Sequence, residues 1–462
     1  MRFAIGVRGM MPPGFAPFVE RAPLCVMTRI TLENLFEADR LDALFASVAR
    51  RQYHRELLFS QVVELMMSVV MRVEGSVHAA YRHRDMPVSD QAIYDKLSGM
   101  EPGLSAALVA DSAERLRPVI DALDARVKPW VPGLRTRILD GNKLGRTESR
   151  LRELRSTWAA ALPGQVLAVY EPELDLVTRV WLTPDAHANE RSLVGEVLEG
   201  VAKDDLWVAD TAFCTLKFLS GLSDADARFV VRQHGTLEGR PLGKRVAKGR
   251  TETGKVFEQT LAVDWQGRTL RLRRITVVLD RPTRNGDTEI HILTNLTATQ
   301  TKATRVAELY RKRWTIEGRF YELAQTLDGE PNTLGYPSAA LFAFCLALVA
   351  SNAVALQRSA LRATHGAEAV EGMSRHYQAE EVRRTYPGMM VALPPEQWAE
   401  FRNLEVGRWA ALLRELAKGA RPGKYRKAVR GPKKKPAAKT AYKNGGHVST
   451  HRLIQQRRKA AK

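Results

Sequence analysis

The chain has 462 residues, and 45% of them are hydrophobic, so it is long enough for roughly three structural units and is not a disordered protein. Its formal net charge of +20 favours a polyanionic partner, because such an excess otherwise only repels itself. We expect nucleic acid, with an anionic membrane surface as the alternative. Three distant cysteines, Cys25, Cys214 and Cys345, favour neither a disulfide framework nor a zinc site and fit a reducing cytoplasm.

Residues 1–27 are expected to form a loose N-terminal tail. Two arginines, Pro12, Pro13 and Glu20 interrupt any apolar run long enough for a signal peptide.

Residues 28–130 are predicted to form a helical N-terminal DNA-binding domain, because apolar side chains recur at helix spacing over most of this range. Within it, Ser89 precedes a short helix that Gly99 ends, and a further helix begins near Leu104. This order is what a helix-turn-helix requires. An ordinary helical hairpin is an equal alternative, because no spacing here is diagnostic.

A different pattern begins after Pro132 and predicts an α/β catalytic domain over residues 131–380. Segments rich in β-forming residues give three strands, a helix and a fourth strand: Arg135–Leu139, Val166–Tyr170, Leu176–Leu182, the helix Glu190–Val201 and the strand Leu206–Ala209. A β-rich insertion is expected at about 215–285, where two alternating segments read as a β-hairpin, Lys255–Trp265 and Thr269–Leu279. The strand Glu289–Thr294 and a long helix starting near Thr301 follow.

The run from Tyr336 to Leu356 carries no charge and is long enough to cross a bilayer. It contains Ser351 and Asn352 and lacks the basic or aromatic flanks that anchor a span, so a buried core helix is favoured. A C-terminal helical region is expected at 381–417.

Residues 418–462 contain sixteen Lys or Arg and no Asp or Glu. Such a block predicts a disordered basic tail that binds phosphates without reading sequence. A solvated solubility tail is the alternative, but it does not explain why the charge has a single sign.

Tyr310, Arg313 and Glu317 stand three and four residues apart, so they share one face of the long helix. The run resembles the Tyr-x-x-Arg-x-x-x-Glu signature of the bacterial insertion-sequence-four family of DDE transposases. The glutamate of that signature is the family's third catalytic carboxylate.

Two upstream motifs resemble the same family. Asp140, followed by Gly141 on the first strand, is similar to the first motif, and Asp210, which closes the fourth strand with Phe213 three residues on, is similar to the second. The sequence departs from the signature at Ala324, where the family has a lysine, so a phosphate contact expected there is missing or comes from another residue.

The resemblance implies an α/β ribonuclease-H-like core with a β-rich insertion, and cut-and-paste transposition of an insertion sequence. It implies that Asp140, Asp210 and Glu317 are catalytic and hold two Mg²⁺ ions, for which Mn²⁺ can substitute. It implies contacts from Tyr310 and Arg313 to phosphates near the scissile bond. The expected partner is double-stranded DNA, both the terminal inverted repeats and the target, bound by a dimer in the synaptic complex. We expect a bacterial cytoplasmic, nucleoid-associated location and no membrane.

Elementary chemistry supports three carboxylates independently of the family. Two magnesium ions about 4 Å apart can activate a nucleophile and stabilise a leaving oxyanion during phosphodiester cleavage. Mg²⁺ takes oxygen ligands and keeps several waters, so carboxylates from separate elements suffice.

Each carboxylate also has a simpler explanation. Asp140 before a glycine fits a turn, Asp210 fits a helix N-cap, and Glu317 fits a surface partner of Arg313. Two alternative functions remain open: a DNA-binding derivative without catalysis, and a ribonuclease-H-like nuclease that cuts but cannot join strands.

Overall fold

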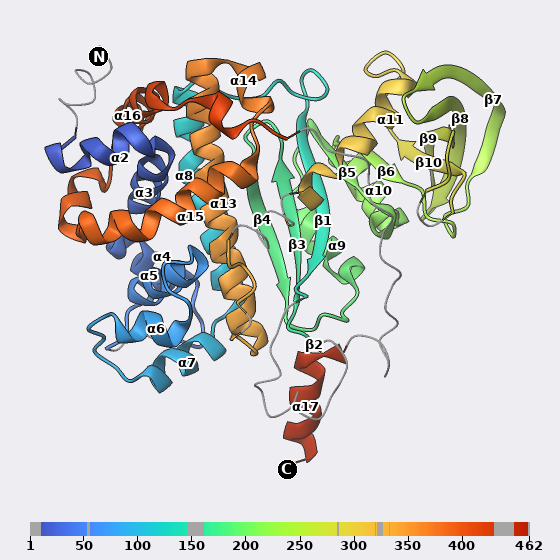
Figure 1. Cartoon of the computed structure of the whole chain (residues 1–462). Coiled ribbons are helices and arrows are strands. Elements are labelled where there is room, and N and C mark those ends of the chain that lie inside the picture. The colour runs from blue at the N-terminus through green and yellow to red at the C-terminus, as the bar shows by residue number, and fades with distance from the viewer. Residues whose placement is uncertain are drawn as a thin grey trace.

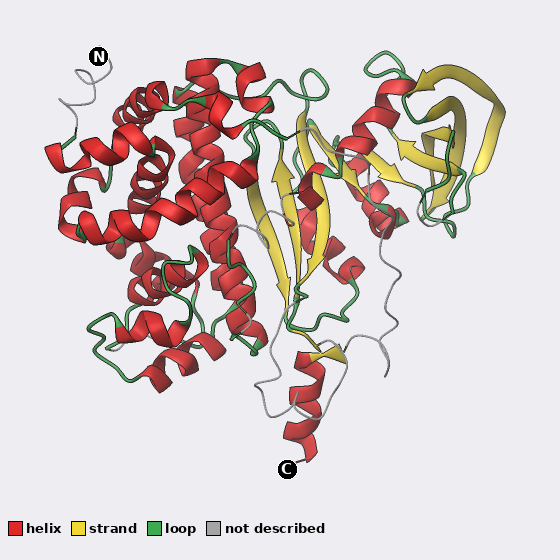
Figure 2. Ribbon diagram, viewed as in Figure 1, coloured by secondary structure: helices red, strands yellow, loops and turns green. Residues whose placement is uncertain are grey.

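The computed structural model describes residues 11–52, 56–145, 161–283, 286–318, 320, 327–331, 333–428 and 448–460. The protein is a mixed α/β structure in which a large helical layer lies against one long sheet (Figure 1, Figure 2).

The main sheet has nine strands in the order β4-β3-β1-β5-β6-β10-β9-β8-β7. They are β1 Arg135–Lys143, β3 Gln165–Glu171, β4 Leu176–Thr183, β5 Asp205–Ala209, β6 Arg228–Arg232, β7 Arg240–Thr251, β8 Gly254–Trp265, β9 Arg268–Leu279 and β10 Glu289–Thr294. A second, two-stranded sheet pairs β2 Ala161–Leu162 with β11 Val448–Ser449 in parallel.

The chemistry expected of this chain lies around β1, which pairs antiparallel with β3 and parallel with β5. β5 is in turn parallel to β6, so these three strands end at the same edge. Ile138 packs into the core under the helical layer, whereas Leu139 packs against α9 Val194–Glu199 and α10 Leu216–Asp224. Because side chains alternate along a strand, these contacts fix the face on which each later residue of β1 lies.

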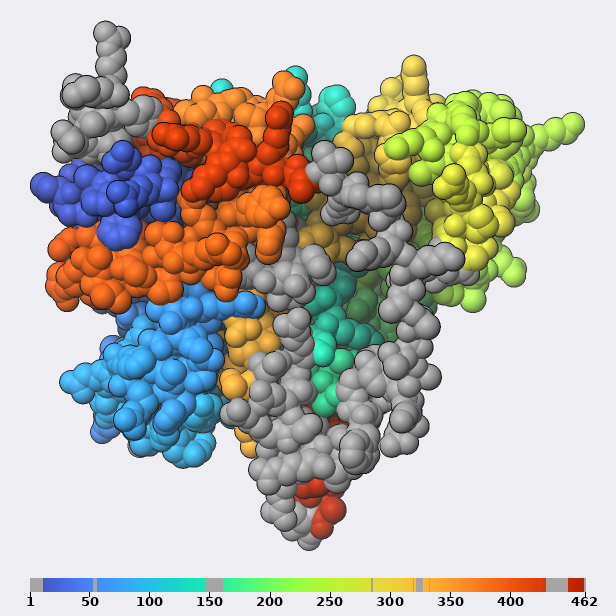
Figure 3. Space-filling view, in the orientation of Figure 1, coloured from blue at the N-terminus to red at the C-terminus, as the bar shows by residue number. Residues whose placement is uncertain are grey.

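The structure confirms the predicted strands to within a few residues, including the β-hairpin of β8 and β9. The insertion is narrower than the predicted 215–285, because α10 and β6 belong to the central part of the sheet. The sequence did not predict β6, because Phe229, Val230 and Val231 are all buried. A short continuous apolar run lacks the alternation of apolar and polar residues that identifies a half-buried strand. Strands β7 to β9 form a lobe on the side away from the helical layer (Figure 3).

The helical layer is built from both ends of the chain, which the blue and orange helices of Figure 1 show side by side. Its N-terminal elements are η1 Pro13–Phe15, α2 Ala16–Arg21, α3 Pro23–Leu35, α4 Ala38–Val48, α5 Phe59–Val70, α6 Val77–Arg82, α7 Asp90–Ser98 and α8 Pro102–Ala122. Its C-terminal elements are α13 Pro337–His365, α14 Ala367–Glu371, α15 Arg375–Ala392, η4 Pro395–Phe401, α16 Val406–Gly419 and η5 Pro422–Tyr425. The predicted boundaries 28–130, 131–380 and 381–417 therefore do not separate structural units, because α13 packs on α8, α3 and α5.

The uncharged run forms α13, as expected of a core helix. Among the described residues, α13 is the one helix long and apolar enough to cross a membrane, and 94% of its most apolar window is buried inside the protein. Its buried Asn352 exchanges two 2.9 Å hydrogen bonds with the backbone of Val177 on β4. The Asn352 amide thus hydrogen-bonds the backbone N–H and C=O of edge strand β4 that no neighbouring strand pairs. This explains why an otherwise apolar helix carries a buried asparagine.

Both predicted tails need correction. Residues 1–10 lie outside the described part, but residues 11–27 are largely helical, and the buried Phe15 ring packs edge-on against Trp398 at 4.8 Å. In the basic C-terminal segment, residues 429–447 lie outside the described part, whereas β11 and α17 Thr450–Ala460 are ordered elements. Pairing with β2, which lies far earlier in the same chain, holds β11 in place, and a sequence pattern cannot reveal such a contact.

The predicted long helix from Thr301 is also interrupted. Helix α11 spans Ala303–Lys312, a turn follows at Arg313 and Trp314, and helical structure resumes at residues 315–318. At the turn, the N–H of Arg313 donates to Tyr310 O at 3.0 Å and that of Ile316 to Arg313 O at 3.1 Å. These bonds span three residues, as in a 3₁₀ turn, a feature that often marks a functional position within a helix.

Candidate active site

Asp140 and Asp210 lie on neighbouring parallel strands at matching positions. The register pairs Ile138 with Val208 and Leu139 with Ala209, so the two aspartates come next on each strand and on the same face of the sheet. Asp210 follows β5 directly, and its carboxylate accepts from Ala212 N at 2.8 Å as the N-cap of η3 Thr211–Phe213. Asp140 lies within β1, which excludes the explanation that it is a turn residue. Asp210 does cap η3, and this role does not prevent its carboxylate from facing Asp140.

Arg313 bridges two of the three predicted carboxylates. Its Nη1 donates to Asp140 Oδ2 at 2.5 Å and its Nη2 donates to Glu317 Oε1 at 2.8 Å. The Arg313 side chain is 8% exposed and that of Glu317 is 48% exposed. Arg313 and Glu317 therefore form the expected ion pair four residues apart. Arg313 is buried, however, so this is not a pair between two surface residues.

Tyr310 lies beside this cluster at the end of α11 and is buried. Burial raises the pKa of its hydroxyl, and the neighbouring guanidiniums of Arg313 and Arg232 oppose that rise. The hydroxyl therefore stays protonated at neutral pH and can donate a hydrogen bond. The structure thus brings together all five residues predicted for the site, on β1, after β5, on α11 and just beyond it.

Electrostatic strain is concentrated at Asp140. Burial is the main cause that raises its pKa to about 7, Arg313 opposes the rise, and the carboxylates of Asp210 and Glu317 add to it. Burial alone would lower the pKa of Arg313, but Asp140, Tyr310 and Glu317 raise it overall. Such a perturbed carboxyl among like charges is typical of a functional site.

The donor set suits a hard divalent cation, because carboxylate oxygens are the ligands that Mg²⁺ and Mn²⁺ prefer. A cation already links Asp140 to Glu317, and it is the guanidinium of Arg313. In the part of the chain that the structure describes, no three His, Cys, Asp or Glu side chains lie close enough together to hold a metal as they stand. In this structure the guanidinium of Arg313 therefore supplies the positive charge between Asp140 and Glu317.

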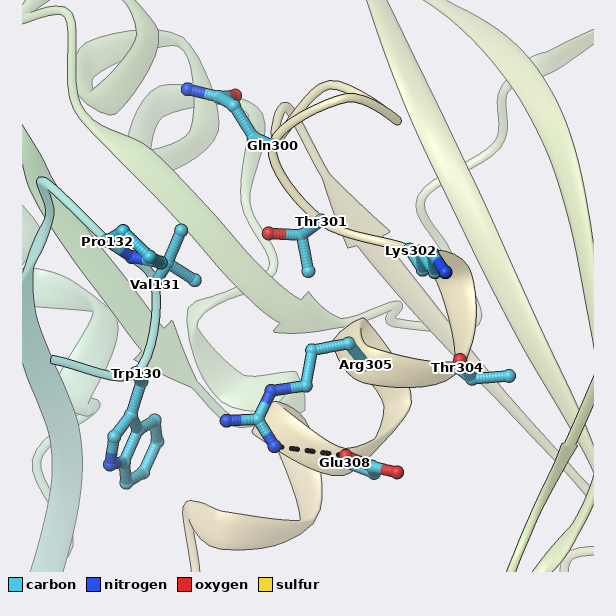
Figure 4. Close-up of a pocket in the computed structure, with 9 residues that line it drawn as sticks. All are labelled: Trp130, Val131, Pro132, Gln300, Thr301, Lys302, Thr304, Arg305 and Glu308. Atoms are coloured by element: carbon cyan, nitrogen blue, oxygen red, sulfur yellow. Dashed lines mark hydrogen bonds and ion pairs between the residues drawn. The ribbon is translucent and has the colours of Figure 1, made fainter. Parts of the chain in front are cut away.

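A separate surface pocket lies where the loop before β1 meets the start of α11 (Figure 4). Trp130, Thr301 and Arg305 are among its lining residues, and Arg305 pairs with Glu308 at 3.0 Å. None of the five predicted site residues lines it, because they lie towards the opposite ends of β1 and α11. It is not the carboxylate site.

Stability without metal should depend on pH through Asp140. A carboxyl whose pKa is raised by folding, here from 3.8 to about 7, contributes stability below about pH 4 that is lost as the pH rises through about 7. That rise corresponds to about 4 kcal/mol. The free energy of unfolding, measured in chelator between about pH 4 and pH 7, should fall less with pH for Asp140→Asn than for the wild type. Parallel pH profiles would show that Asp140 titrates normally.

Residues 135–353 match the family model described as "Transposase DDE domain", a span that contains Asp140, Asp210 and Glu317. The match supports a transposase of the DDE type. No curated protein matches the chain. Among solved structures, "Cryo-EM structure of piggyBac transposase synaptic complex with hairpin DNA (SNHP)" has a TM-score of 0.36 and 9% sequence identity, and the match covers 83% of this chain and 86% of that chain. A likeness of this size carries no argument about function.

Proposed function

We propose that the protein is a DDE transposase of the insertion-sequence-four type that cuts and rejoins DNA through a metal-dependent phosphodiester reaction. One observation carries the proposal: the carboxylates of Asp140 on β1 and Glu317 beyond α11 share the guanidinium of Arg313, and the carboxylate of Asp210 at the end of β5 is close enough to raise the pKa of Asp140, all within the span matched by a transposase domain. In support of a ribonuclease-H-like core, β3 runs antiparallel to both β4 and β1, while β1, β5 and β6 run parallel to one another.

Asp140, Asp210 and Glu317 would hold Mg²⁺ or Mn²⁺. Bound there, divalent ions supply a strong nucleophile at neutral pH and stabilise the developing charge on the leaving oxygen. The chain's own contribution is to place hard oxygen donors at the carboxyl ends of two parallel strands, where ligands of open α/β sheets bind. Because Asp140 lies within a strand, its backbone is fixed before any ligand arrives.

Arg313 has two roles in this proposal. Without metal it neutralises Asp140 and Glu317, which would otherwise repel each other. With DNA present its fork-shaped guanidinium contacts a phosphate near the scissile bond, because arginine matches phosphate geometry with two parallel hydrogen bonds. Tyr310 lies beside it and donates its hydroxyl to the same phosphate group. Ala324, at the position of the family's lysine, lies outside the described residues.

The substrate is double-stranded DNA, which the net charge of +20 attracts. We place the protein in the bacterial cytoplasm, acting as a dimer when two DNA ends are brought together.

The experiment that tests the function is a strand-transfer assay. A linear donor carrying the gene with its flanking DNA is incubated with a supercoiled target plasmid and Mg²⁺. A transposase joins donor ends to the plasmid. Cleavage without joining would replace the proposal by a nuclease, and binding without cleavage would replace it by a DNA-binding protein without catalysis.

Helix α17 is expected to add to non-specific DNA binding. Arg457, Arg458 and Lys459 are exposed in its last turn, and Arg452 anchors its start to Asp185 at 2.8 Å. Changing the three exposed cations to Gln should lower the slope of log affinity against log salt by up to about 3, since fewer counterions are released. Fluorescence anisotropy with unrelated duplex DNA measures this slope. An unchanged slope would place α17 off the DNA.

A further inference from the structure

The surface pocket at the start of α11 has the features of an anion site. Its volume is about 290 Å³, at the low end for pockets that bind small ligands. Trp130, Val131 and Pro132 form one wall, and Gln300, Thr301 and the first turn of α11 form the other (Figure 4).

The first turn of α11 presents backbone N–H groups that the helix itself does not use. The first helical hydrogen bond runs from Val306 N to Lys302 O at 3.0 Å. The N–H groups of residues 303–305 come before it and have no partner inside the helix. No side chain of the described residues caps this end, and the first turn carries no acidic residue. Free N–H groups and the positive end of the helix dipole together favour an anion at this position.

The hydroxyl of Thr301 is a second, independent observation. The residue is 5% exposed, and its Oγ1 has no hydrogen-bond partner among the described residues. Figure 4 shows the hydroxyl pointing into the pocket, towards Val131. The backbone of Thr301 is fixed on both sides, since its N–H donates to Thr297 O at 3.0 Å and its C=O accepts from Arg273 Nη1 at 3.0 Å. A buried hydroxyl without a partner is unfavourable, so a ligand that accepts its hydrogen bond removes that penalty.

The charged side chains around the pocket also favour an anion. Lys302 is exposed at the N-terminus of α11, and Lys312 Nζ lies 5.4 Å from the centre of the Trp130 ring. Glu308 is the acidic residue of the lining, and it pairs with Arg305 at 3.0 Å. Both side chains of that pair are at least 40% exposed, so the pair contributes at most about 1 kcal/mol. Arg305 is therefore free to turn towards a phosphate, while Glu308 takes no part in binding it.

The length of α11 limits which phosphate can reach the pocket. Its 10 residues span about 15 Å, at about 1.5 Å per residue. The pocket lies at one end, and Tyr310 and Arg313, which contact the phosphate near the scissile bond in the proposed function, lie at the other. Phosphates of one strand are about 3.4 Å apart along the DNA axis, so a phosphate in the pocket lies at most about four base pairs from the scissile one.

We propose that this pocket is a second phosphate site, in which the first turn of α11 and the Thr301 hydroxyl hold a backbone phosphate of the bound DNA. Lys302 and Arg305 supply the positive charge at its rim. The site positions DNA along α11 without touching the reacting atoms. The inference rests on the proposed function for the identity of the DNA, whereas the affinity of the pocket for phosphate does not depend on catalysis.

Binding of inorganic phosphate in chelator tests the site itself, because no metal ion can then hold phosphate at the carboxylates. A phosphorus NMR titration measures the affinity. Thr301→Val keeps the branched shape and removes the hydroxyl, so it should weaken binding about tenfold, the loss of one hydrogen bond to a charged group. The matched control is Thr299→Val, on the same loop but outside the pocket, where the exposed hydroxyl lies 2.8 Å from that of Thr297. It should bind phosphate as the wild type does.

Thermal midpoints separate a ligand contact from a structural role. Without phosphate, Thr301→Val should melt no lower than the wild type, because it removes a buried hydroxyl that has no partner. With phosphate it should gain less, since a ligand stabilises the folded state in proportion to its binding. A lower midpoint in both conditions together with unchanged phosphate affinity would show a structural threonine and overturn the site.

DNA duplexes identify the source of the phosphate. A neutral methylphosphonate is placed at one position at a time, within about four base pairs of the scissile bond. One such replacement should lower the affinity of the wild type and leave that of Thr301→Val unchanged. If every replacement weakened both proteins equally while inorganic phosphate still bound, the pocket would hold a free anion and the DNA assignment would be overturned.

Two further outcomes distinguish this inference from the proposed function. Phosphate binding that Arg313→Ala abolishes and Thr301→Val leaves intact would place the phosphate at the carboxylates and overturn the pocket site. A wild type that binds phosphate through Thr301 but neither cleaves nor joins DNA would overturn the proposed function and leave the phosphate site standing.

Discussion

Asp140→Asn, Asp210→Asn and Glu317→Gln are each expected to reduce cleavage of end-containing DNA by at least about a thousandfold, or about 4 kcal/mol of activation barrier. Each change removes one charged oxygen donor at the strand ends or beyond α11. DNA affinity should stay within about twofold of the wild type, because the contacts to the phosphate backbone are made elsewhere. Gel-based cleavage rates and fluorescence anisotropy on the same preparations measure the two effects.

Glu308→Gln is the matched control for these variants. Glu308 lies on α11 as well, but its exposed side chain pairs with Arg305 away from the carboxylates. Its cleavage rate should equal that of the wild type. Wild-type cleavage by any one of the three site variants would remove that residue from the catalytic set.

Arg313→Ala is expected to have two effects that a surface arginine would not produce. Without metal it leaves the buried Asp140 carboxylate without its cation, and breaking a buried pair in this way costs about 3–5 kcal/mol of unfolding free energy. With DNA it loses the phosphate contact, so cleavage should fall as well. Added Mg²⁺ should restore much of the lost stability, since the ion replaces the missing positive charge beside Asp140, but it should not restore cleavage.

Arg311→Ala is the control for this prediction. Arg311 lies on the same helix and pairs with Glu252 at 2.7 Å, but both side chains are more than half exposed. Exposed pairs of this kind contribute at most about 1 kcal/mol. Denaturant unfolding with and without Mg²⁺ compares the variants. If Arg313→Ala were no less stable than Arg311→Ala in chelator, the bridge between Asp140 and Glu317 would not hold the site together.

Sequence patterns predicted the strands whose apolar residues alternate regularly. They also predicted the candidate site residues that lie in short local motifs. The strands β1, β3, β4 and β5 and the β8–β9 hairpin were predicted because alternation and turn residues are local signals. Asp140 and Asp210 were singled out for the same reason, since Asp140 lies within a recognisable strand and Asp210 directly follows another.

Long-range contacts account for what the sequence did not reveal. Phe15 belongs to the helical core because Trp398 and Phe401, almost four hundred residues later, pack against it. Arg313 is spaced to meet Glu317 along a helix, but its bond to Asp140 joins residues that are 173 positions apart. Glu190 meets Gly141 across the end of a sheet, a contact that no periodic pattern encodes. Fold class and individual motifs are local properties, whereas the charge balance of the site is a property of the tertiary structure.

The most direct test of the proposed metal site is the position of bound metal in crystals soaked with Mn²⁺, located by its anomalous scattering. We predict a Mn²⁺ peak in contact with the carboxylates of Asp140 and Asp210, with Glu317 turned towards it and the Arg313 guanidinium no longer on Asp140. Mn²⁺ bound elsewhere, with the Asp140–Arg313–Glu317 bridge intact at full occupancy, would contradict it.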